Sequence, residues 1–86
     1  MRRSPEVVFE VLDGRAVLVD PSGSELITLN PVGTLVWEAL DEERNLDQVV
    51  DHLLPQFVGV ERPELHADVS GFLRELEGLG LLAGRP

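Results

Sequence analysis

The chain offers few side chains that are suited to catalysis. It has two histidines, His52 and His66, and it lacks cysteine and tyrosine. Ser70, His66 and Asp68 supply the three residue types of a hydrolytic triad, but Ser70 and His66 are four residues apart and share one face of a single helix. No neighbouring segment provides an oxyanion hole for such a site. The sequence therefore predicts no catalytic residue and no enzyme.

Three carboxylates at helical spacing, Glu38, Asp41 and Glu42, are the best candidates for holding a cation. A hard cation such as Ca²⁺ takes about six to eight oxygen ligands from a shaped loop, and no such loop follows these residues. The glycines do not form a phosphate-binding motif either, and we interpret them as turn and packing residues. We expect a solvated acidic face here, with no metal site and no cofactor.

The composition restricts the possible partners. Seven arginines and sixteen acidic residues give the 86 residues a net charge of −9, and there is no cysteine for a disulfide or a thiolate site. Nucleic acids and anionic membranes attract clustered cations, so this charge argues against both. Without a long apolar run or a signal-peptide pattern, we expect a single cytoplasmic domain over residues 1–86. Its ordered core is expected to cover about residues 6–82, with mobile ends at residues 2–5 and 84–86.

The first third of the chain has the pattern of three β-strands. Runs rich in Val, Ile, Leu and Thr occupy residues 7–12, 15–20 and 25–29. Asp13-Gly14 between the first two runs favours a type I′ turn, because glycine tolerates the positive φ that this turn requires. Residues 20–23 (DPSG) are typical of a second turn. We therefore expect an antiparallel meander.

Helical periodicity begins after this meander. Asn30 and Pro31 are typical of an N-cap and a first helical residue, because the Asn side chain accepts an unpaired N–H and proline has none to lose. We expect helices over about residues 30–41, 46–54 and 63–80. The predicted fold is α+β and winged-helix-like, with a three-stranded antiparallel β-meander packed on three α-helices (β-β-β-α-α-α). The apolar face of the third helix consists of Leu65, Val69, Phe72, Leu73, Leu76 and Leu79.

The third strand of this meander has an unguarded edge. Residues 25–29 form an outer strand without the lysine, proline or bulge that usually protects such an edge. A protein that adds a peptide strand from a partner needs an open edge beside an apolar helix face. Proline at Ile27 is expected to remove one hydrogen-bond donor from this edge. Gly71 lies in the middle of the third helix and has no side chain. We expect either another element of the chain or a bound peptide backbone to approach the helix closely there.

Three groups of residues match a pattern known from other proteins. They are Leu29-Asn30-Pro31-Val32-Gly33 with Trp37, then Ala67-Asp68-Val69 with Phe72-Leu73 and Leu76, and finally Gly80-Leu81-Leu82. These motifs resemble the PqqD-like family of precursor-peptide recognition domains, over residues 7–82 and in the same order. The chain is most similar to the stand-alone leader-binding protein of lasso-peptide pathways. The alternative within the family is the peptide chaperone of pyrroloquinoline quinone biosynthesis.

The resemblance implies a non-catalytic protein that binds the N-terminal leader of a precursor peptide. The leader would add as a fourth strand, antiparallel to the third, in the groove between that strand and the third helix. A leader peptidase and a macrolactam synthetase would then act on the bound precursor. Residues 24–28 lack the aromatics of many relatives, so we expect a more aliphatic groove. The peptide-binding residues implied in this way are Glu25, Leu26, Ile27, Thr28, Leu29, Leu65, Asp68, Val69, Phe72, Glu75 and Leu76.

Two other functions fit the predicted topology. A winged-helix DNA-binding regulator has the same arrangement, but the third helix offers only Arg74 against four acidic residues. A homodimer that pairs its own edge strands would need no peptide ligand, although we expect a monomer. For the leader-binding function, the acidic surface predicts a leader that contains Lys or Arg and associates more slowly as salt is added.

Overall fold

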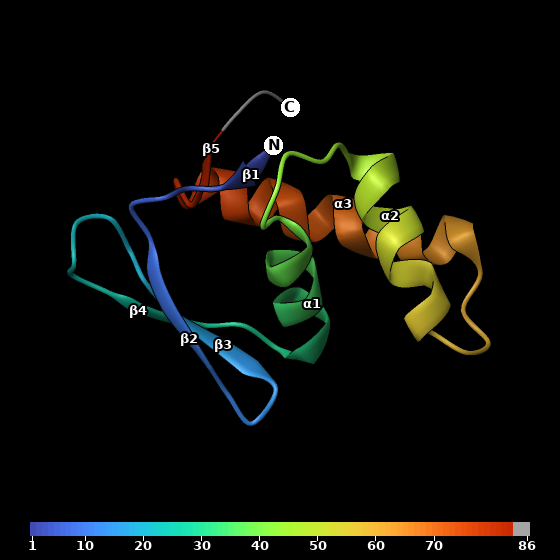
Figure 1. The fold of residues 1–86 in the computed structure, drawn as a ribbon, viewed down its shortest axis with the longest axis horizontal. Helices are drawn as coiled ribbons and strands as arrows, with labels where there is room; N and C mark the ends of the chain where they lie inside the picture. The colour runs from blue at the N-terminus through green and yellow to red at the C-terminus, as the bar shows by residue number, and fades with distance from the viewer. Residues whose placement is uncertain (84–86) are drawn as a thin grey trace.

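The computed structural model describes residues 1–83, in which a small sheet lies beside a layer of helices (Figure 1). This arrangement confirms the predicted α+β fold with a three-stranded antiparallel meander and three α-helices. Within residues 1–83, no helix is long and apolar enough to cross a membrane. The elements in chain order are β1 (Arg2–Arg3), β2 (Val8–Leu12), β3 (Arg15–Val19), β4 (Leu26–Thr28), α1 (Pro31–Ala39), α2 (Leu46–Leu53), the 3₁₀ turn η1 (Leu54–Gln56), α3 (Arg62–Gly78) and β5 (Leu82–Ala83).

The meander has the strand order β2-β3-β4, so β4 is an outer strand as predicted. Asp13 and Gly14 have φ angles of 52° and 74°, which is the geometry that a type I′ hairpin turn requires. In the second turn, the N–H of Gly23 donates to the carbonyl of Asp20 over 2.9 Å. Gly23 also has a positive φ of 75°, which explains why glycine occupies this position.

Within residues 1–83, helices cover one face of this sheet (Figure 1). Ala16 and Leu18 point towards the helices and are completely buried. Phe9, on the same face, packs edge-on against Trp37, with ring centres 5.6 Å apart. The residues that alternate with these point away from the helices, and Val8 and Leu26 among them are exposed.

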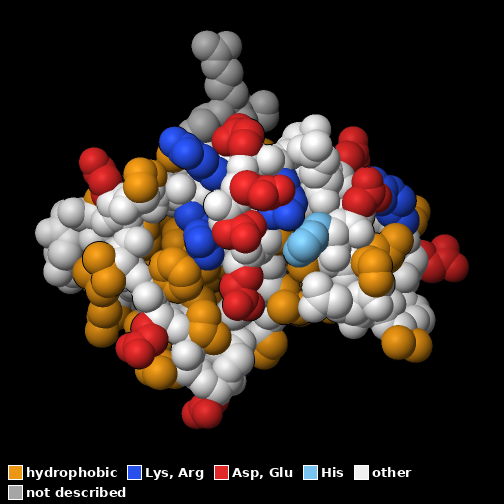
Figure 2. Space-filling model, viewed as in Figure 1, with side chains coloured by type: hydrophobic (Ala, Val, Ile, Leu, Met, Phe, Trp, Pro, Cys, Tyr) orange, Lys and Arg blue, Asp and Glu red, His pale blue; other side chains and the backbone are white. Residues whose placement is uncertain are grey.

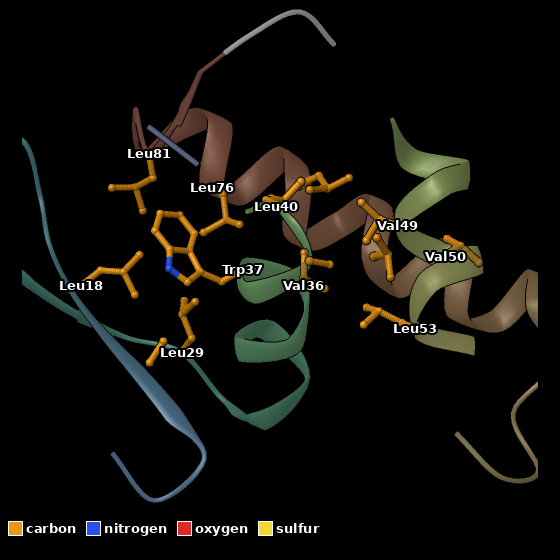
Figure 3. Close-up of a cluster of buried hydrophobic side chains, with 14 of the residues drawn as sticks. Leu18, Leu29, Val36, Trp37, Leu40, Val49, Val50, Leu53, Leu76 and Leu81 are labelled. Atoms are coloured by element: carbon orange, nitrogen blue, oxygen red, sulfur yellow. The ribbon is translucent and has the colours of Figure 1, made fainter. Parts of the chain in front are cut away.

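The core is centred on Trp37, which is completely buried. Figure 3 shows its indole ring among Leu18 and Leu29 on one side and Leu76 and Leu81 on the other. Sheet, α1 and the end of α3 therefore share a single cluster of apolar side chains. This cluster continues towards α2 through Val36, Leu40, Val49, Val50 and Leu53.

Side-chain caps fix the starts of the first two helices. Asn30 Oδ1 accepts the N–H of Gly33 over 2.7 Å, and Pro31 is the first residue of α1, as predicted. α2 begins with a capping box, which was not predicted from the sequence. Its two residues, Asn45 and Gln48, exchange side-chain-to-backbone hydrogen bonds of 2.8 and 2.9 Å.

The expectation of a mobile start at residues 2–5 is wrong. Arg2 and Arg3 form β1, which pairs antiparallel with β5 after the end of α3 (Figure 1). The N–H of Arg3 donates to the carbonyl of Leu40 over 3.0 Å, and its guanidinium lies 4.7 Å from the ring centre of Phe9. These long-range contacts hold the first residues in place. The same expectation for residues 84–86 lies outside the described residues.

A buried hydrogen bond joins the sheet to α1. Thr34 is 2% exposed, and its hydroxyl accepts the N–H of Ala16 over 2.8 Å. The carbonyl of Ala16 accepts the N–H of Leu29, also over 2.8 Å. Ala16 in the central strand therefore holds both the end of β4 and the first turn of α1.

We expect Thr34→Val to lower the free energy of unfolding by about 1–3 kcal/mol, because the buried N–H of Ala16 would lose its acceptor without a change in side-chain shape. Urea denaturation followed by circular dichroism measures this loss. Thr28→Val makes the same chemical change at an exposed position and should have little effect. Equal midpoints for Thr34→Val and the wild type would contradict the role given to this hydrogen bond.

Candidate functional site

The residues considered for catalysis do not form a triad. His66 Nε2 lies 3.7 Å from Asp47 Oδ1 on α2, not beside Asp68, whose side chain is exposed. The hydroxyl of Ser70 accepts a hydrogen bond of 3.3 Å from Arg74. The side chains of α3 therefore give no nucleophile-and-base pair of the kind that a hydrolase needs.

The acidic residues after α1 have a structural partner. Arg44 forms ion pairs with Asp41 at 2.8 Å and with Glu42 at 3.3 Å. The carboxylates thus surround a guanidinium. Across residues 1–83, no group of three or more His, Cys, Asp or Glu side chains is placed to hold a metal ion.

A cleft of about 270 Å³ lies between β4 and α3. One wall consists of β4 and the two residues that follow it, and the other wall consists of the last turns of α3. Most of the lining is apolar, and Glu75 is the charged residue in it. The complete lining is Ile27, Thr28, Leu29, Asn30, Phe72, Glu75, Leu76 and Leu79.

Buried residues anchor both walls of the cleft. Leu29 holds the end of β4 at 7% exposure, and Leu76 holds α3 at 1%. Beside these anchors, Ile27 and Phe72 are half-buried and Leu79 is 47% exposed. The walls are therefore fixed by the core, while apolar surface between them is accessible to a ligand.

The backbone of β4 presents unpaired groups at its outer edge. The carbonyl of Glu25 accepts the N–H of Asp20, just after β3, over 3.2 Å, and the N–H of Leu29 donates to the carbonyl of Ala16 in β3 over 2.8 Å. Hydrogen-bonded residues alternate along an antiparallel strand, so Ile27 also directs its backbone groups to β3. The N–H and C=O groups of Leu26 and Thr28 consequently face the open edge. The expectation that proline at Ile27 removes an edge donor is wrong for this reason.

The structure brings part of the predicted peptide-binding set to this cleft. The predicted residues that line it are Ile27, Thr28, Leu29, Phe72, Glu75 and Leu76. Sequence reasoning missed two lining residues. Leu79 follows Leu76 by three positions on the same apolar face, so its spacing was a usable signal. Asn30 was recognised only as a helix cap.

The other five predicted residues lie elsewhere. Leu65 and Val69 are 2% and 0% exposed, in the core where α3 packs against α2. Glu25 and Leu26 are exposed at the start of β4, and Asp68 is exposed on α3. The peptide-contacting part of the apolar face of α3 is thus expected to be its C-terminal half.

Gly71 has open space around it. A β-carbon added there would meet no atom within 4 Å. The expectation that another element of the chain packs closely against Gly71 is therefore wrong, and the backbone of α3 is uncovered at this point.

Negative charge occurs on α3 in the cleft and next to it. Asp68 and Glu75 are both exposed, and their spacing places them on the same face of α3 as Phe72. Figure 2 shows one face of the molecule, with acidic side chains across its middle and hydrophobic side chains gathered over the sheet. In the cleft, the carboxylate of Glu75 among apolar residues favours a ligand that combines apolar side chains with positive charge.

Two solved structures resemble this chain over all or almost all of its length. One, "TbiB1 in Complex with the TbiA(beta) Leader Peptide", has a TM-score of 0.86 and 30% sequence identity, covering 100% of this chain and 99% of that one. The other, "Lasso peptide synthetase B1 complexed with the leader peptide", has a TM-score of 0.79 and 24% identity over 96% of both chains, and shows the fold. Among curated protein sequences, none matches this chain.

A family model described as coenzyme PQQ synthesis protein D (PqqD) matches residues 15–82. The match extends from β3 to β5 and includes both walls of the cleft and the connection from β4 into α1. It confirms the resemblance that the sequence motifs indicated. The chain belongs to the PqqD family.

Proposed function

We propose that this protein recognises the leader of a ribosomally made precursor peptide and binds it as a fourth strand on β4. One observation carries the proposal, namely that an unpaired strand edge and an apolar cleft occur at the same place. Strand addition uses these two features together, because the edge supplies hydrogen bonds and the pockets beside it supply specificity. The two similar structures are of proteins in complex with leader peptides, which supports this function.

Backbone pairing sets the register of the added strand. Leu26 and Thr28 each offer one donor and one acceptor at the open edge. Such hydrogen bonds contribute about 0.5–1.5 kcal/mol each after the loss of water is counted, so they do not account for the whole affinity. The antiparallel direction that we propose matches the pairing of β3 with β4.

Apolar burial supplies most of the remaining affinity. Ile27, Phe72 and Leu79 keep accessible apolar surface in the cleft. A leader residue of the size of Val, Leu or Phe contributes about 1.5–3 kcal/mol when it is fully buried there. Two or three such residues, less the cost of ordering a flexible leader, correspond to a micromolar to nanomolar Kd.

The chain has a binding role in this proposal, and the chemistry belongs to its partners. In a lasso-peptide pathway these partners are a leader peptidase and a macrolactam synthetase, to which the protein presents the precursor. The peptide occupies the strand edge and the cleft, so its modified part remains outside and accessible to those enzymes. The likeness to TbiB1 in complex with a leader peptide, and to lasso peptide synthetase B1, covers almost the whole chain and supports this assignment.

The family model favours a second candidate, a chaperone that delivers the precursor peptide of pyrroloquinoline quinone biosynthesis. Both candidates use the same cleft and differ in the peptide. Titration with two synthetic peptides, the leader of a lasso precursor and a pyrroloquinoline quinone precursor, separates them. Preferential binding of the first supports the lasso pathway, and preferential binding of the second supports the alternative.

We expect Thr28→Pro to weaken binding of the synthetic lasso leader by at least about tenfold, because it removes an edge N–H and places a ring in the path of the added strand. Fluorescence anisotropy of a labelled peptide measures the affinity. Val11→Pro is a matched control on the opposite edge of the sheet, since Val11 pairs with Ala16 at a position that is not hydrogen-bonded. It should bind as the wild type does. Equal losses in both folded variants would contradict addition to β4.

We expect Glu75→Lys to weaken binding of a leader that carries Lys or Arg by about three- to tenfold at low salt, because it reverses the charge inside the cleft. The difference from the wild type should shrink as salt is added. Glu77→Lys makes the same charge change on α3 outside the cleft lining. If the two variants lose affinity equally, the effect comes from net charge and not from the cleft.

A further inference from the structure

Gly33 and Phe72 are in unusually close contact. Gly33 is buried in the first turn of α1, and a β-carbon added to it would lie 2.5 Å from Cε1 and 3.0 Å from Cζ of Phe72. Carbon atoms that are not bonded do not approach to 2.5 Å, so a side chain at Gly33 and the present ring position exclude each other. The Phe72 ring lies in space that only glycine leaves free.

The backbone conformation gives no other reason for glycine here. Gly33 is not among the residues with a positive φ, and it lies within a regular helix. Alanine is favoured over glycine inside helices, so local stability alone would select alanine. Space for the aromatic ring is the remaining physical reason for glycine at this position.

The first turn of α1 is closed by its own cap and anchored to the sheet. The N–H of Gly33 donates to Asn30 Oδ1 over 2.7 Å, and the neighbouring Thr34 is bound to Ala16 in β3. Phe72, in contrast, is half-buried and lines the cleft between β4 and α3. A side chain at Gly33 would therefore displace the ring towards the cleft, where there is open space.

We propose that Gly33 is a positioning residue for peptide recognition, because it allows the Phe72 ring to lie against α1 and so keeps the cleft open. This inference rests on the proposed leader-binding function and adds a determinant of specificity to it. The depth of the pocket beside Phe72 sets the largest apolar side chain that a leader can place there. Gly33, which does not line the cleft, controls that depth through the ring.

The test compares Gly33→Ala with the wild type in titrations with the synthetic lasso leader. We expect the affinity to fall by at least about tenfold, while circular dichroism shows a folded chain. Gly78→Ala is the control, since Gly78 lies on α3 outside the cleft lining and an added β-carbon meets no atom within 4 Å, and it should bind within about twofold of the wild type. In the free protein, the NMR signals of the Phe72 ring should shift in Gly33→Ala and stay unchanged in Gly78→Ala.

A second set of variants isolates the role of the ring. Phe72→Leu removes Cε1 and Cζ, the two atoms that a β-carbon at Gly33 would approach most closely. Adding Gly33→Ala to Phe72→Leu should then change peptide affinity by less than about twofold. An alanine scan of the leader also tests the ring. At the leader residue that lies against Phe72, alanine should reduce the affinity less for Gly33→Ala than for the wild type.

The outcomes separate this inference from the proposed function. A folded Gly33→Ala variant that binds the leader as tightly as the wild type would overturn the inference alone. If Gly33→Ala does not fold, the double variant of Gly33→Ala and Phe72→Leu decides. If this double variant does not fold either, Gly33 does not act through Phe72, and the inference is overturned. A wild-type chain that binds neither precursor peptide would overturn the proposed function itself.

Discussion

The shape of the candidate site depends on the two hydrogen bonds made by Ala16 in the central strand. Its carbonyl binds the N–H of Leu29 and its N–H binds the hydroxyl of Thr34, both over 2.8 Å. Leaving such buried groups unpaired is costly, so β4 and α1 are held to β3 together. The connection between them consists of Leu29 and Asn30. The strand edge and the first turn of α1 thus form one rigid unit.

The opposite wall of the cleft is held by burial in the core. α3 packs against α2 through its N-terminal half, and Leu76 and Leu81 fix its C-terminal end around Trp37. A hydrogen bond of 3.0 Å from the N–H of Leu81 to the carbonyl of Leu76 closes this end of the helix. Two walls anchored in the same core form a preorganised cleft. Most of the ordering cost of binding therefore falls on the peptide.

Local signals in the sequence predict much of the fold, because they act on neighbouring backbone. The Asn30-Pro31 cap and the turn glycines are examples. Features set by contacts between distant segments were not predictable in this way. β1 depends on pairing with the end of the chain, and the periodicity of α3 gives Leu65, Val69 and Phe72 the same apolar face. Only the packing of α2 decides that the first two are covered and the third remains open to the cleft.

The central claim is that a leader adds as a strand to the outer edge of β4. Hydrogen exchange of backbone amides, followed by NMR with and without the synthetic lasso leader, tests it most directly. The account predicts slower exchange at Leu26 and Thr28 on binding, while Val11 on the opposite edge is unchanged. Saturable binding that leaves exchange at Leu26 and Thr28 unaffected would contradict strand addition.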